Sequence, residues 1–423
     1  MIKPIIGFAG MTHLGLVSGV SAAEKKFQVI CFDADRDKVK ALNQGILTIS
    51  EPQLNELVFK NKSQILFTDD VADLKKCDIV YVAPDVATDD FGKSDLANID
   101  ALLNLTFDAT RNETVIVVLS QVPPGFTRRQ VRTGRTLYYQ VETLVFGRAV
   151  ERALYPERYI IGCIDSGQAL SVTYESFLAA YDCPILKMRY ESAELAKISI
   201  NMCLVASVST ANTLAELCEK IGADWSEIVP ALKLDKRIGQ YSYLTPGLGI
   251  AGGNLERDLV TIRNFADEFG TDAGVVKSCI ANSNHRRDWP LRLLHEVILK
   301  KNSKAIVGVW GLAYKQNTDS IKNSPSIALL KAIYNTHVRV FDPVVSVTAV
   351  PNRYCHDAAS ELDACTGVDV LVIMTPWPQF SKVNPKDIAK MMKGNIVIDP
   401  FKALDAKACR DVGLVYFTLG VAN

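Results

Sequence analysis

Short apolar runs alternate with longer amphipathic stretches through the first third of the chain. Each run ends in a polar residue or in a turn rich in glycine or proline, which is typical of buried strands that alternate with helices. The runs read "PIIGFA", "FQVICFD", "QILFT", "DIVYVA" and "TVIVVLS". This alternation predicts βαβ units and a parallel, doubly wound sheet.

The rest of the chain continues with one long helical pattern and a second alternating block. Between about Glu191 and Lys220, apolar residues recur every three or four positions, which predicts a long helix. From Lys304 onward the strand-like runs are "KAIVGVWG", "HVRVFDP", "DVLVIMT", "NIVIDP" and "GLVYFTL". We therefore expect an α/β fold in which two Rossmann-like, doubly wound parallel-sheet domains are joined by a central helical domain. The predicted domains are residues 1–190, 191–300 and 301–423.

The predicted long helix has more apolar surface than its own polypeptide is expected to cover. An exposed apolar face of this size is typical of a subunit interface, and most such interfaces relate identical chains. The sequence therefore predicts a homodimer built on the central helices. The alternative is that the helix is buried between the two flanking domains of one chain.

The composition narrows the classes of partner. In the 423 residues, 47 lysine and arginine side chains balance 47 aspartate and glutamate side chains, so no overall field attracts nucleic acid or an anionic membrane. No apolar run reaches the length of a membrane span, and the N-terminus does not have the pattern of a signal peptide. The ten cysteines are scattered without metal-binding spacing, so we expect no metal site and reduced thiols in a cytoplasmic protein.

The turn after the first strand-like run carries the spacing of a dinucleotide-binding site. Gly10, Thr12 and Gly15 occupy the three glycine positions of G-x-G-x-x-G, with threonine at the second. The first glycine permits a tight turn, and the third lets the helix pack closely on the strand. His13 and Leu14 then begin the helix, whose free N–H groups and positive dipole can hold a pyrophosphate. A similar turn that binds no cofactor is the alternative.

Asp33 ends the second strand-like run, where a carboxylate can accept hydrogen bonds from both hydroxyls of a cofactor ribose. A carboxylate at this place disfavours a 2′-phosphate, so the sequence predicts NAD as the cofactor rather than NADP. Arg36 lies nearby in sequence and weakens this preference, because an arginine can accommodate the phosphate.

Several stretches make the chain resemble the UDP-glucose/GDP-mannose dehydrogenase family of nucleotide-sugar 6-dehydrogenases. They are "GLVSGVSAAEKKFQVICFDAD", "ISEPQLNELV", "SQVPPGFTR", "AELAKISINMCLVASVSTANTLAELCEKIGAD", "RIGQYSYLTPGLGIAGGNLERD" and "VWGLAYKQNTDSIKNSPSIALLKAI". They follow one another in the family's order and span nearly the whole chain. The most specific are "ELAKISINM" and "GLAYKQNTDSIKNSP".

The resemblance implies an N-terminal NAD domain, a central dimerisation domain and a C-terminal domain for the sugar nucleotide. Members of the family oxidise a sugar C6 alcohol to a carboxylate in two NAD-dependent steps. In the family a lysine and an asparagine on the long helix flank the reacting carbon, and here they match Lys197 and Asn201. Four residues apart, both lie on one helical face, where an ammonium and an amide can stabilise a developing alkoxide.

Further site residues follow from the resemblance. Asp258 matches an aspartate just after the catalytic loop that can relay a proton or hold a water. Glu142 matches the first carboxylate of the family's P-E-F-L-R-E-G segment. Arg237 and Lys315 match residues that reach the sugar nucleotide, the former across a dimer interface in some relatives. Gly252 belongs to the loop "GLGIAGGNLERD", whose backbone we expect close to the substrate.

This loop departs from the family at its reactive position. The family's loop reads roughly G-G-S-C-F-P-K-D, and its cysteine attacks the intermediate aldehyde to form a thiohemiacetal that gives up the second hydride. Aligning on the "RD" pair places Asn254 at the cysteine, and aligning on the glycine pair places Leu255 there. Neither side chain can form a thioester. The nearest cysteines in sequence, Cys218 and Cys279, are too remote for a simple shift of register.

Other departures also fall on the second oxidation. The Ser-Thr pair before the family's V-P-x-G-T becomes Ser120-Gln121, which keeps a serine for the cofactor site but replaces the hydroxyl that helps to position the catalytic water. The second carboxylate of the P-E-F-L-R-E-G segment becomes Phe146. Because Lys197, Asn201 and the NAD turn remain, the pattern favours altered chemistry over a dead enzyme.

Three functions are compatible with these residues. The first is an NAD-dependent oxidoreductase that acts on the CH–OH group of a nucleotide-activated sugar and stops after two electrons, or returns the hydride as an epimerase does. The second is a full four-electron UDP-sugar 6-dehydrogenase in which a water, activated by Asp258 or Glu142, replaces the thiolate. The third is a non-catalytic partner that binds NAD and a sugar nucleotide. The nucleotide, the sugar and the oxidised carbon stay open.

Overall fold

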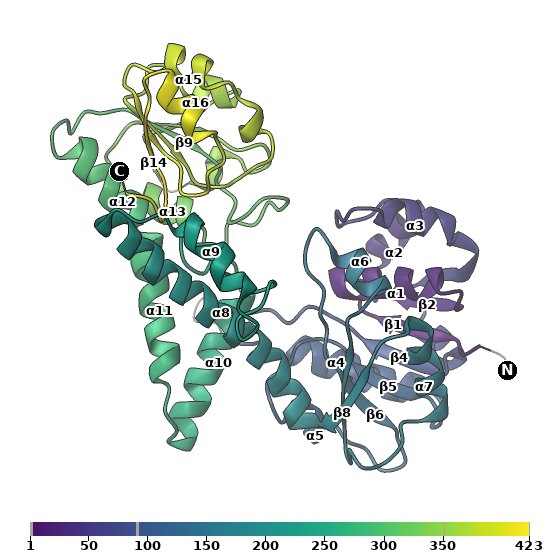
Figure 1. The fold of residues 1–423 in the computed structure, drawn as a ribbon. Coiled ribbons are helices and arrows are strands. Elements are labelled where there is room, and N and C mark those ends of the chain that lie inside the picture. The colour runs from purple at the N-terminus through teal and green to yellow at the C-terminus, as the bar shows by residue number, and fades with distance from the viewer. Residues whose placement is uncertain (1–2, 90–92, 351, 423) are drawn as a thin grey trace. The chain divides into compact units, whose positions relative to one another are not determined.

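The chain forms two compact units in the computed structural model, Met1–Ile200 and Asn201–Asn423 (Figure 1). The structure describes residues 3–89, 93–350 and 352–422, and the side chain of Asn254 lies outside the described part. The boundary between the units falls inside helix α8, Tyr190–Ile221, which is the long helix that the sequence predicts.

The first unit is built on an eight-stranded sheet with the order β3-β2-β1-β4-β5-β6-β7-β8. The strands are β1 Ile6–Ala9, β2 Val29–Phe32, β3 Ile65–Thr68, β4 Ile79–Val82, β5 Val115–Val118, β6 Leu137–Gln140, β7 Tyr159–Cys163 and β8 Ile185–Arg189. Neighbouring strands are parallel except β6 and β7, which are antiparallel. The strand order reverses between β1 and β4, and ligands of doubly wound sheets bind beyond the carboxyl ends of the strands at such a point.

Helices cover both faces of this sheet, which explains why its strands read as unbroken apolar runs. In β5, Val115 and Val117 enter the core on the α1 side, while Ile116 and Val118 enter the core that includes α4 and the start of α8. The helices of the unit before α8 are α1 His13–Glu24, α2 Arg36–Asn43, α3 Leu54–Lys60, α4 Ala97–Ala109, α5 Phe126–Arg129, α6 Ala149–Leu154 and α7 Val172–Leu178.

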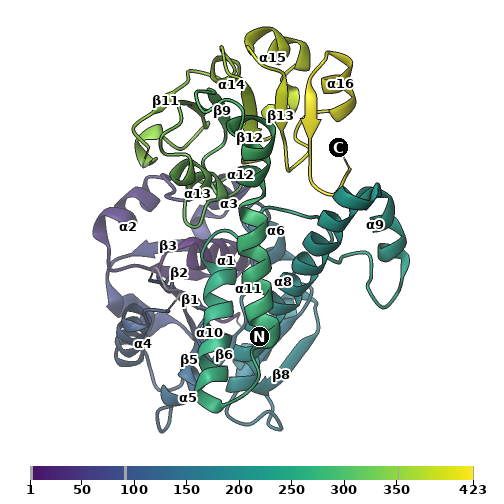
Figure 2. The ribbon, with the colours of Figure 1, turned by 90° about the vertical axis from the view of Figure 1, so that its left-hand side faces the viewer.

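The second unit combines the central helices with a six-stranded parallel sheet of order β11-β10-β9-β12-β13-β14. The strands are β9 Val307–Trp310, β10 Val338–Phe341, β11 Cys355–Asp357, β12 Val370–Ile373, β13 Ile396–Ile398 and β14 Val415–Phe417. The helices are α9 Trp225–Leu234, α10 Asn254–Phe269, α11 Gly274–Arg287, α12 Trp289–Leu294, α13 Pro325–Ala332, α14 Glu361–Ala364, α15 Pro385–Met391 and α16 Ala406–Asp411. Figure 2 shows α10 and α11 lying side by side.

The part of α8 that belongs to the second unit packs against α10 and α11 through Val205, Leu259 and Val276 (Figure 2). By length and composition alone α8 is also apolar enough to cross a membrane, with 28% of its most apolar window buried. A core helix of a soluble protein meets the same criteria, so this feature is weak evidence for a membrane span.

The predicted fold class is confirmed, with two parallel Rossmann-like sheets and a helical centre. Every strand-like run named from the sequence contains a strand. The sequence runs miss β6, β7, β8 and β11, and with them the antiparallel pair in the first sheet. The boundaries of the three predicted domains stay a prediction.

Candidate functional site

The turn between β1 and α1 needs both of its glycines. Gly10 has a φ of +97°, and a Cβ there would lie 2.9 Å from the backbone nitrogen of Pro84. A Cβ on Gly15 would lie 2.0 Å from the carbonyl oxygen of Gly10. Only glycine therefore lets α1 begin this close to β1, as the sequence predicts.

The first turn of α1 is left open for an anion. Thr12 is the N-cap residue, but its hydroxyl donates to the carbonyl oxygen of Ala83 at 2.9 Å and does not cap the helix. The backbone N–H groups of His13 and Leu14 belong to this first turn, while the Leu14 side chain packs into the core. Uncapped N–H groups at the positive end of a helix dipole suit a pyrophosphate, so the residues present fit a dinucleotide.

Asp33 stands at this turn and is already hydrogen-bonded. Its carboxylate accepts from the N–H of Met11 at 2.7 Å and from the Lys38 ammonium at 2.9 Å. Arg36 instead pairs with Asp69 at 3.2 Å and has a side chain that is 88% exposed. The cation beside Asp33 is thus Lys38, which the sequence reasoning missed. Its position in the first turn of α2, after the capping Asp35, is the signal that would have identified it.

Ser120 and the loop that follows it are held by buried contacts. The Ser120 hydroxyl, fully buried, donates to the carbonyl oxygen of Pro84 at 2.5 Å and so joins the ends of β5 and β4. Further along the loop, the buried Glu194 of α8 accepts from the N–H groups of Gly125 at 2.6 Å and Thr127 at 2.8 Å. Burial raises the pKa of Glu194, while these hydrogen bonds act in the opposite direction. The backbone of this loop is therefore held by Glu194, which precedes Lys197 by three residues on α8.

Lys197 and Glu142 come together within the first unit. The Lys197 ammonium lies 2.7 Å from a Glu142 carboxylate oxygen, and the two side chains are 12% and 18% exposed. The other oxygen of Glu142 accepts from the N–H of Leu144 at 2.8 Å. The contact holds an amine and a carboxyl group side by side with little solvent around them, which suits the transfer of a proton at an alcohol.

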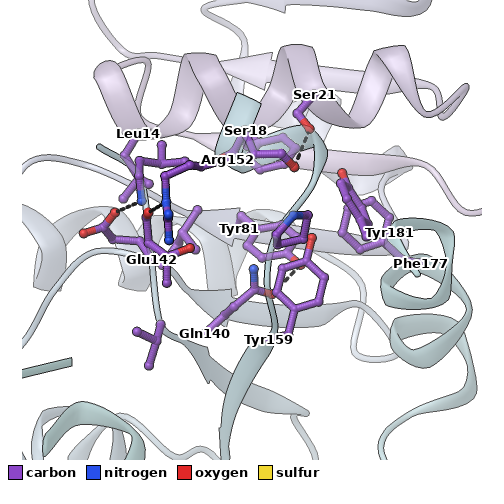
Figure 3. A pocket seen from close by; sticks show the side chains of 17 residues that line it. Leu14, Ser18, Ser21, Tyr81, Gln140, Glu142, Arg152, Tyr159, Phe177 and Tyr181 are labelled. Atoms are coloured by element: carbon purple, nitrogen blue, oxygen red, sulfur yellow. Dashed lines mark hydrogen bonds between the residues drawn. The ribbon is translucent and has the colours of Figure 1, made fainter. Parts of the chain in front are cut away.

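Figure 3 shows a small cavity beside this segment, lined by Glu142, Arg152, Gln140, several tyrosines and apolar side chains such as Leu14 and Phe177. Gln140 accepts hydroxyl hydrogen bonds from Tyr81 at 2.9 Å and Tyr174 at 2.7 Å. The cavity has a volume of ≈ 50 Å³, which is room for a few waters and not for a nucleotide. It supports the segment that carries Glu142 and is not the substrate site.

Asn201 and Asp258 come together within the second unit. The Asn201 amide donates to one oxygen of Asp258 at 2.5 Å, and Arg257 lies 3.3 Å from the other oxygen. Asn201, Arg257 and Asp258 are all buried. The sequence reasoning missed Arg257, although a buried carboxylate next to it in sequence requires a compensating charge.

The glycine-rich loop before α10 is fastened to the loop between β9 and α13. The N–H of Gly252 donates to the carbonyl oxygen of Lys322 at 3.1 Å, and the Asn323 amide donates to the carbonyl oxygen of Gly252 at 3.0 Å and to Glu256. Gly252 has a φ of +79°, and a Cβ there would lie 2.9 Å from the ring of Tyr314. The glycine is needed because a second loop lies against the backbone.

Two further contacts hold the same loop. Gly247 donates its N–H to the Asn212 side chain at 2.8 Å, and Ile250 donates its N–H to the Ser283 hydroxyl at 2.7 Å. A groove of ≈ 290 Å³ borders the loop, lined by Ile250 and by residues of α10, α11, α13 and the segment before α13. The backbone of the loop is thus fixed from several sides.

The Cys279 side chain is buried in the core cluster against which Ile250 and Leu255 of this loop pack. Asn254 begins α10, with its side chain outside the described part, and Leu255 packs against a core cluster. Cys218 and Cys279 are buried in core clusters. Cys203 is exposed but stands two residues from Asn201, which is about 200° around α8.

Two predicted substrate contacts lie apart from these pairs. Arg237 pairs with its neighbour Asp235 at 2.6 Å, and its side chain is 89% exposed. The Lys315 ammonium lies 5.6 Å from the centre of the Tyr314 ring, which itself contacts Gly252. Lys315 is therefore near the glycine-rich loop, whereas Arg237 faces solvent in the single chain.

Comparisons with known proteins agree on one family along most of the chain. Residues 5–178 match the NAD binding domain of the UDP-glucose/GDP-mannose dehydrogenase family, residues 191–285 its central domain, and residues 308–406 its UDP binding domain. UDP-glucose 6-dehydrogenase of Rickettsia conorii is 29% identical, covering 98% of this chain and 99% of its own. The Bacillus subtilis enzyme TuaD, also a UDP-glucose 6-dehydrogenase, is 26% identical, covering 98% and 93%.

Solved structures share the fold. A UDP-glucose dehydrogenase from Pyrobaculum islandicum superposes with a TM-score of 0.85 at 24% identity, covering 100% of this chain and 98% of its own. A UDP-D-ManNAc dehydrogenase from Pyrococcus horikoshii gives a TM-score of 0.84 at 24% identity, covering 98% and 99%.

Proposed function

Because the chain belongs to the UDP-glucose/GDP-mannose dehydrogenase family and is an NAD-dependent nucleotide-sugar dehydrogenase, we propose that it performs only the first of that family's two oxidations. The observation that carries this proposal is that residues 247–258 contain no cysteine. The resemblance places Asn254, or Leu255 in the other alignment, where the family has its nucleophilic cysteine. The groups expected to remove a hydride are kept, whereas the group that captures the aldehyde is not. The substrate we propose is a UDP-sugar, on the basis of the relatives' names and the UDP binding domain.

NAD would be held by the turn of Gly10 and Gly15 and by Asp33, and it would supply the acceptor for the hydride. Lys197 stabilises the alkoxide that develops as the C–H bond breaks. Glu142, 2.7 Å from Lys197, keeps the ammonium in place and accepts the alcohol proton through it or through a water. The balance is one alcohol and one NAD⁺ giving one aldehyde or ketone, one NADH and one proton.

The second polar group of the proposed site is the Asn201 amide, which Asp258 orients. The Asn201 amide is fixed by its bond to Asp258, whose charge is balanced by Arg257. Asn201 stands one helical turn after Lys197 on α8, so both side chains lie on one face of that helix. We propose that the amide directs the oxygen of the reacting carbon.

Without a thiolate, the aldehyde or ketone formed in the first oxidation should not be captured covalently. It should either leave the protein or stay bound as a carbonyl compound. The thioester route needs a sulfur at position 254, and water is a poorer nucleophile than a thiolate at neutral pH. A second candidate, full oxidation through the aldehyde hydrate, is favoured by the names of the relatives, which are UDP-glucose 6-dehydrogenases. Asp258 or Glu142 would then serve as the base.

The experiment is to measure NADH formed per sugar consumed with purified protein, NAD and a panel of UDP-sugars. We expect one NADH per sugar and a carbonyl product that reacts with hydroxylamine. Two NADH per sugar in the wild-type protein would overturn the proposal, and product without net NADH would indicate transient oxidation. Asn254→Cys should gain the second NADH, and Leu255→Cys, the matched control for the other alignment, should not.

We also propose that the protein is a cytoplasmic homodimer. Its ten cysteines are free, which suits a reducing compartment. Large apolar side chains are exposed at the ends of α8 and α9 and in the segment after α9, among them Ile221 at 64%, Leu234 at 84% and Tyr241 at 86%. Light scattering should give twice the mass of the chain. Leu234→Asp should shift the mass to that of a monomer, and Phe59→Asp, on the exposed face of α3, should not.

A further inference from the structure

One buried carboxylate links the cofactor turn to the segment that carries Glu142. Glu51, on the loop before α3, has a fully buried side chain, and one of its oxygens lies 2.8 Å from the Nε2 atom of His13. Its two oxygens also accept from the N–H of Gly147 at 2.9 and 3.0 Å and from the N–H of Ala149 at 3.3 Å. His13 is the first residue of α1, and Gly147 is five residues after Glu142.

An aromatic contact follows the same connection. The rings of His13 and Phe146 lie 4.3 Å apart, tilted by 38°. The imidazole of His13 is thus held between the Glu51 carboxylate and a phenyl ring. Phe146 stands where the family has its second carboxylate, so this contact is a feature of the present chain.

The other end of the segment is held as well. Arg152 donates to the carbonyl oxygen of Thr143 at 2.6 Å, and Glu142 pairs with Lys197. Residues 142–149 are therefore fastened at Glu142, at Thr143 and at Gly147. Of these three attachments, the one at Gly147 also involves the cofactor turn, because Glu51 contacts both Gly147 and His13.

We propose that Glu51 is a positioning residue that couples the cofactor turn to Glu142. When a dinucleotide contacts the first turn of α1, His13 is held in place, and Glu51 transmits that position to Gly147 and so to the Glu142–Lys197 pair. Loss of the Glu51 charge frees His13 and loosens the 142–149 segment together. The inference rests on the proposed roles of Lys197 and Glu142 for its catalytic part, and its binding part requires only the NAD domain.

The test is Glu51→Gln in the full-length protein, because glutamine keeps the size and one acceptor oxygen but removes the charge opposite His13. Since hydrogen bonds to charged groups are the strong ones, we expect the Kd for NADH to rise about 10-fold and kcat to fall about 10-fold. Glu56→Gln, on the exposed face of α3, is the matched control and should change neither. The melting temperature of each variant reports on folding.

A double-mutant cycle separates positioning from a structural role. If Glu51 acts through Glu142, the loss of kcat in Glu51→Gln/Glu142→Gln is smaller than the product of the two single losses. If Glu51→Gln lowers the melting temperature but leaves the NADH Kd and kcat unchanged, the inference is wrong. If it does not fold, His13→Phe, which keeps a ring beside Phe146 but removes the hydrogen bond to Glu51, should still raise the NADH Kd, and an unchanged Kd overturns the inference.

Measuring the Kd for NADH distinguishes a failure of the Glu51 coupling from a failure of the proposed function. If Glu51→Gln binds NADH as tightly as the wild-type protein does, the proposed coupling is wrong. The proposed yield of one NADH per sugar is not affected by that result. If the wild-type protein forms two NADH per sugar, the proposal that it performs only the first oxidation is wrong. The change in the NADH Kd still tests the role of Glu51.

Discussion

The two sheets begin with the same device and use it differently. Gly10 and Gly311 follow the first strand of each sheet with φ values of +97° and +94°. In each sheet an aspartate after the neighbouring strand accepts N–H bonds from the turn, Asp33 from Met11 and Asp342 from Leu312 at 2.6 Å. The turns then diverge.

In the first unit α1 starts at His13, so the helix N-terminus lies directly at the turn. In the second unit α13 starts only at Pro325, and the intervening loop carries Tyr314, Lys315 and Asn323 toward the glycine-rich loop. A glycine turn and a strand-end aspartate therefore do not by themselves place a helix N-terminus at the turn. The distance to the next helix decides whether the turn presents a helix N-terminus or a loop.

The largest expected effect comes from filling the two turns. In Gly15→Val the new Cβ would lie 2.0 Å from the Gly10 carbonyl oxygen, so α1 must move. We expect NADH binding in a fluorescence titration to weaken by about 100-fold or more. In Gly311→Val the Cβ would lie 2.4 Å from Thr375, which should lower the melting temperature but leave NADH affinity unchanged. Equal losses of NADH affinity in both variants would remove the distinction between the turns.

The next effect concerns the two aspartates. Asp33→Asn removes a charged acceptor from the cofactor turn and should raise the NADH Kd about 10-fold. Asp342→Asn should leave that Kd as it is, because Asp342 binds the backbone of Leu312 and the indole N–H of Trp377, at 3.1 Å, in the second unit. It should instead lower the free energy of unfolding by about 2 kcal/mol, measured by urea denaturation.

A smaller effect is expected from Asn323→Ala, which sharpens the role of the second loop. It removes the bonds of Asn323 to Gly252 and Glu256, so the glycine-rich loop is held less firmly. We expect KM for the sugar nucleotide to rise about 5-fold, with the NADH Kd unchanged. Gln316→Ala, an exposed change on the same loop, is the control, and an equal rise of KM there would contradict this role.

The smallest effect lies on the surface of the first unit. Arg128 lies 2.8 Å from Glu191 and lowers the pKa of that carboxyl to about 2. A lowered pKa stabilises the fold above the unfolded value of about 4.3, and this contribution is lost as the pH falls toward 2. Because both side chains are more than a third exposed, Glu191→Gln should cost less than ~1 kcal/mol at pH 7. Urea unfolding at pH 7 and pH 3 should show the difference from wild type shrinking, and a constant difference would contradict the assignment.

Local pattern was enough to predict the sheets and the cofactor turn. The strands buried on both faces read as unbroken apolar runs, and the spacing of Gly10, Thr12 and Gly15 sets the turn. Strand β8 was missed because Lys187 interrupts it, and β6 because its apolar run is only three residues long before Gln140. The antiparallel pairing of β6 with β7 depends on contacts that no local pattern records.

The site was predicted less completely, because its pairs join distant segments. Glu142 and Lys197 were placed from the family resemblance, and spacing alone would not have paired them. Glu51 looks like a solvated loop carboxylate in the sequence, but its partner Gly147 is 96 residues away. Lys38 and Arg257 were missed for a related reason, since the need for a cation becomes visible only once a neighbouring carboxylate is seen to be buried.

The hydrogen bonds at Gly252 have a consequence for substitutions at position 254. Both polar groups of this peptide are satisfied by residues about seventy positions later in the chain, so the path of the backbone does not depend on which side chain follows at Asn254. A residue exchanged at position 254 would leave both of these hydrogen bonds in place. We therefore expect Asn254→Cys to keep the melting temperature of the wild-type protein, so that any change in its products reports on reactivity and not on folding.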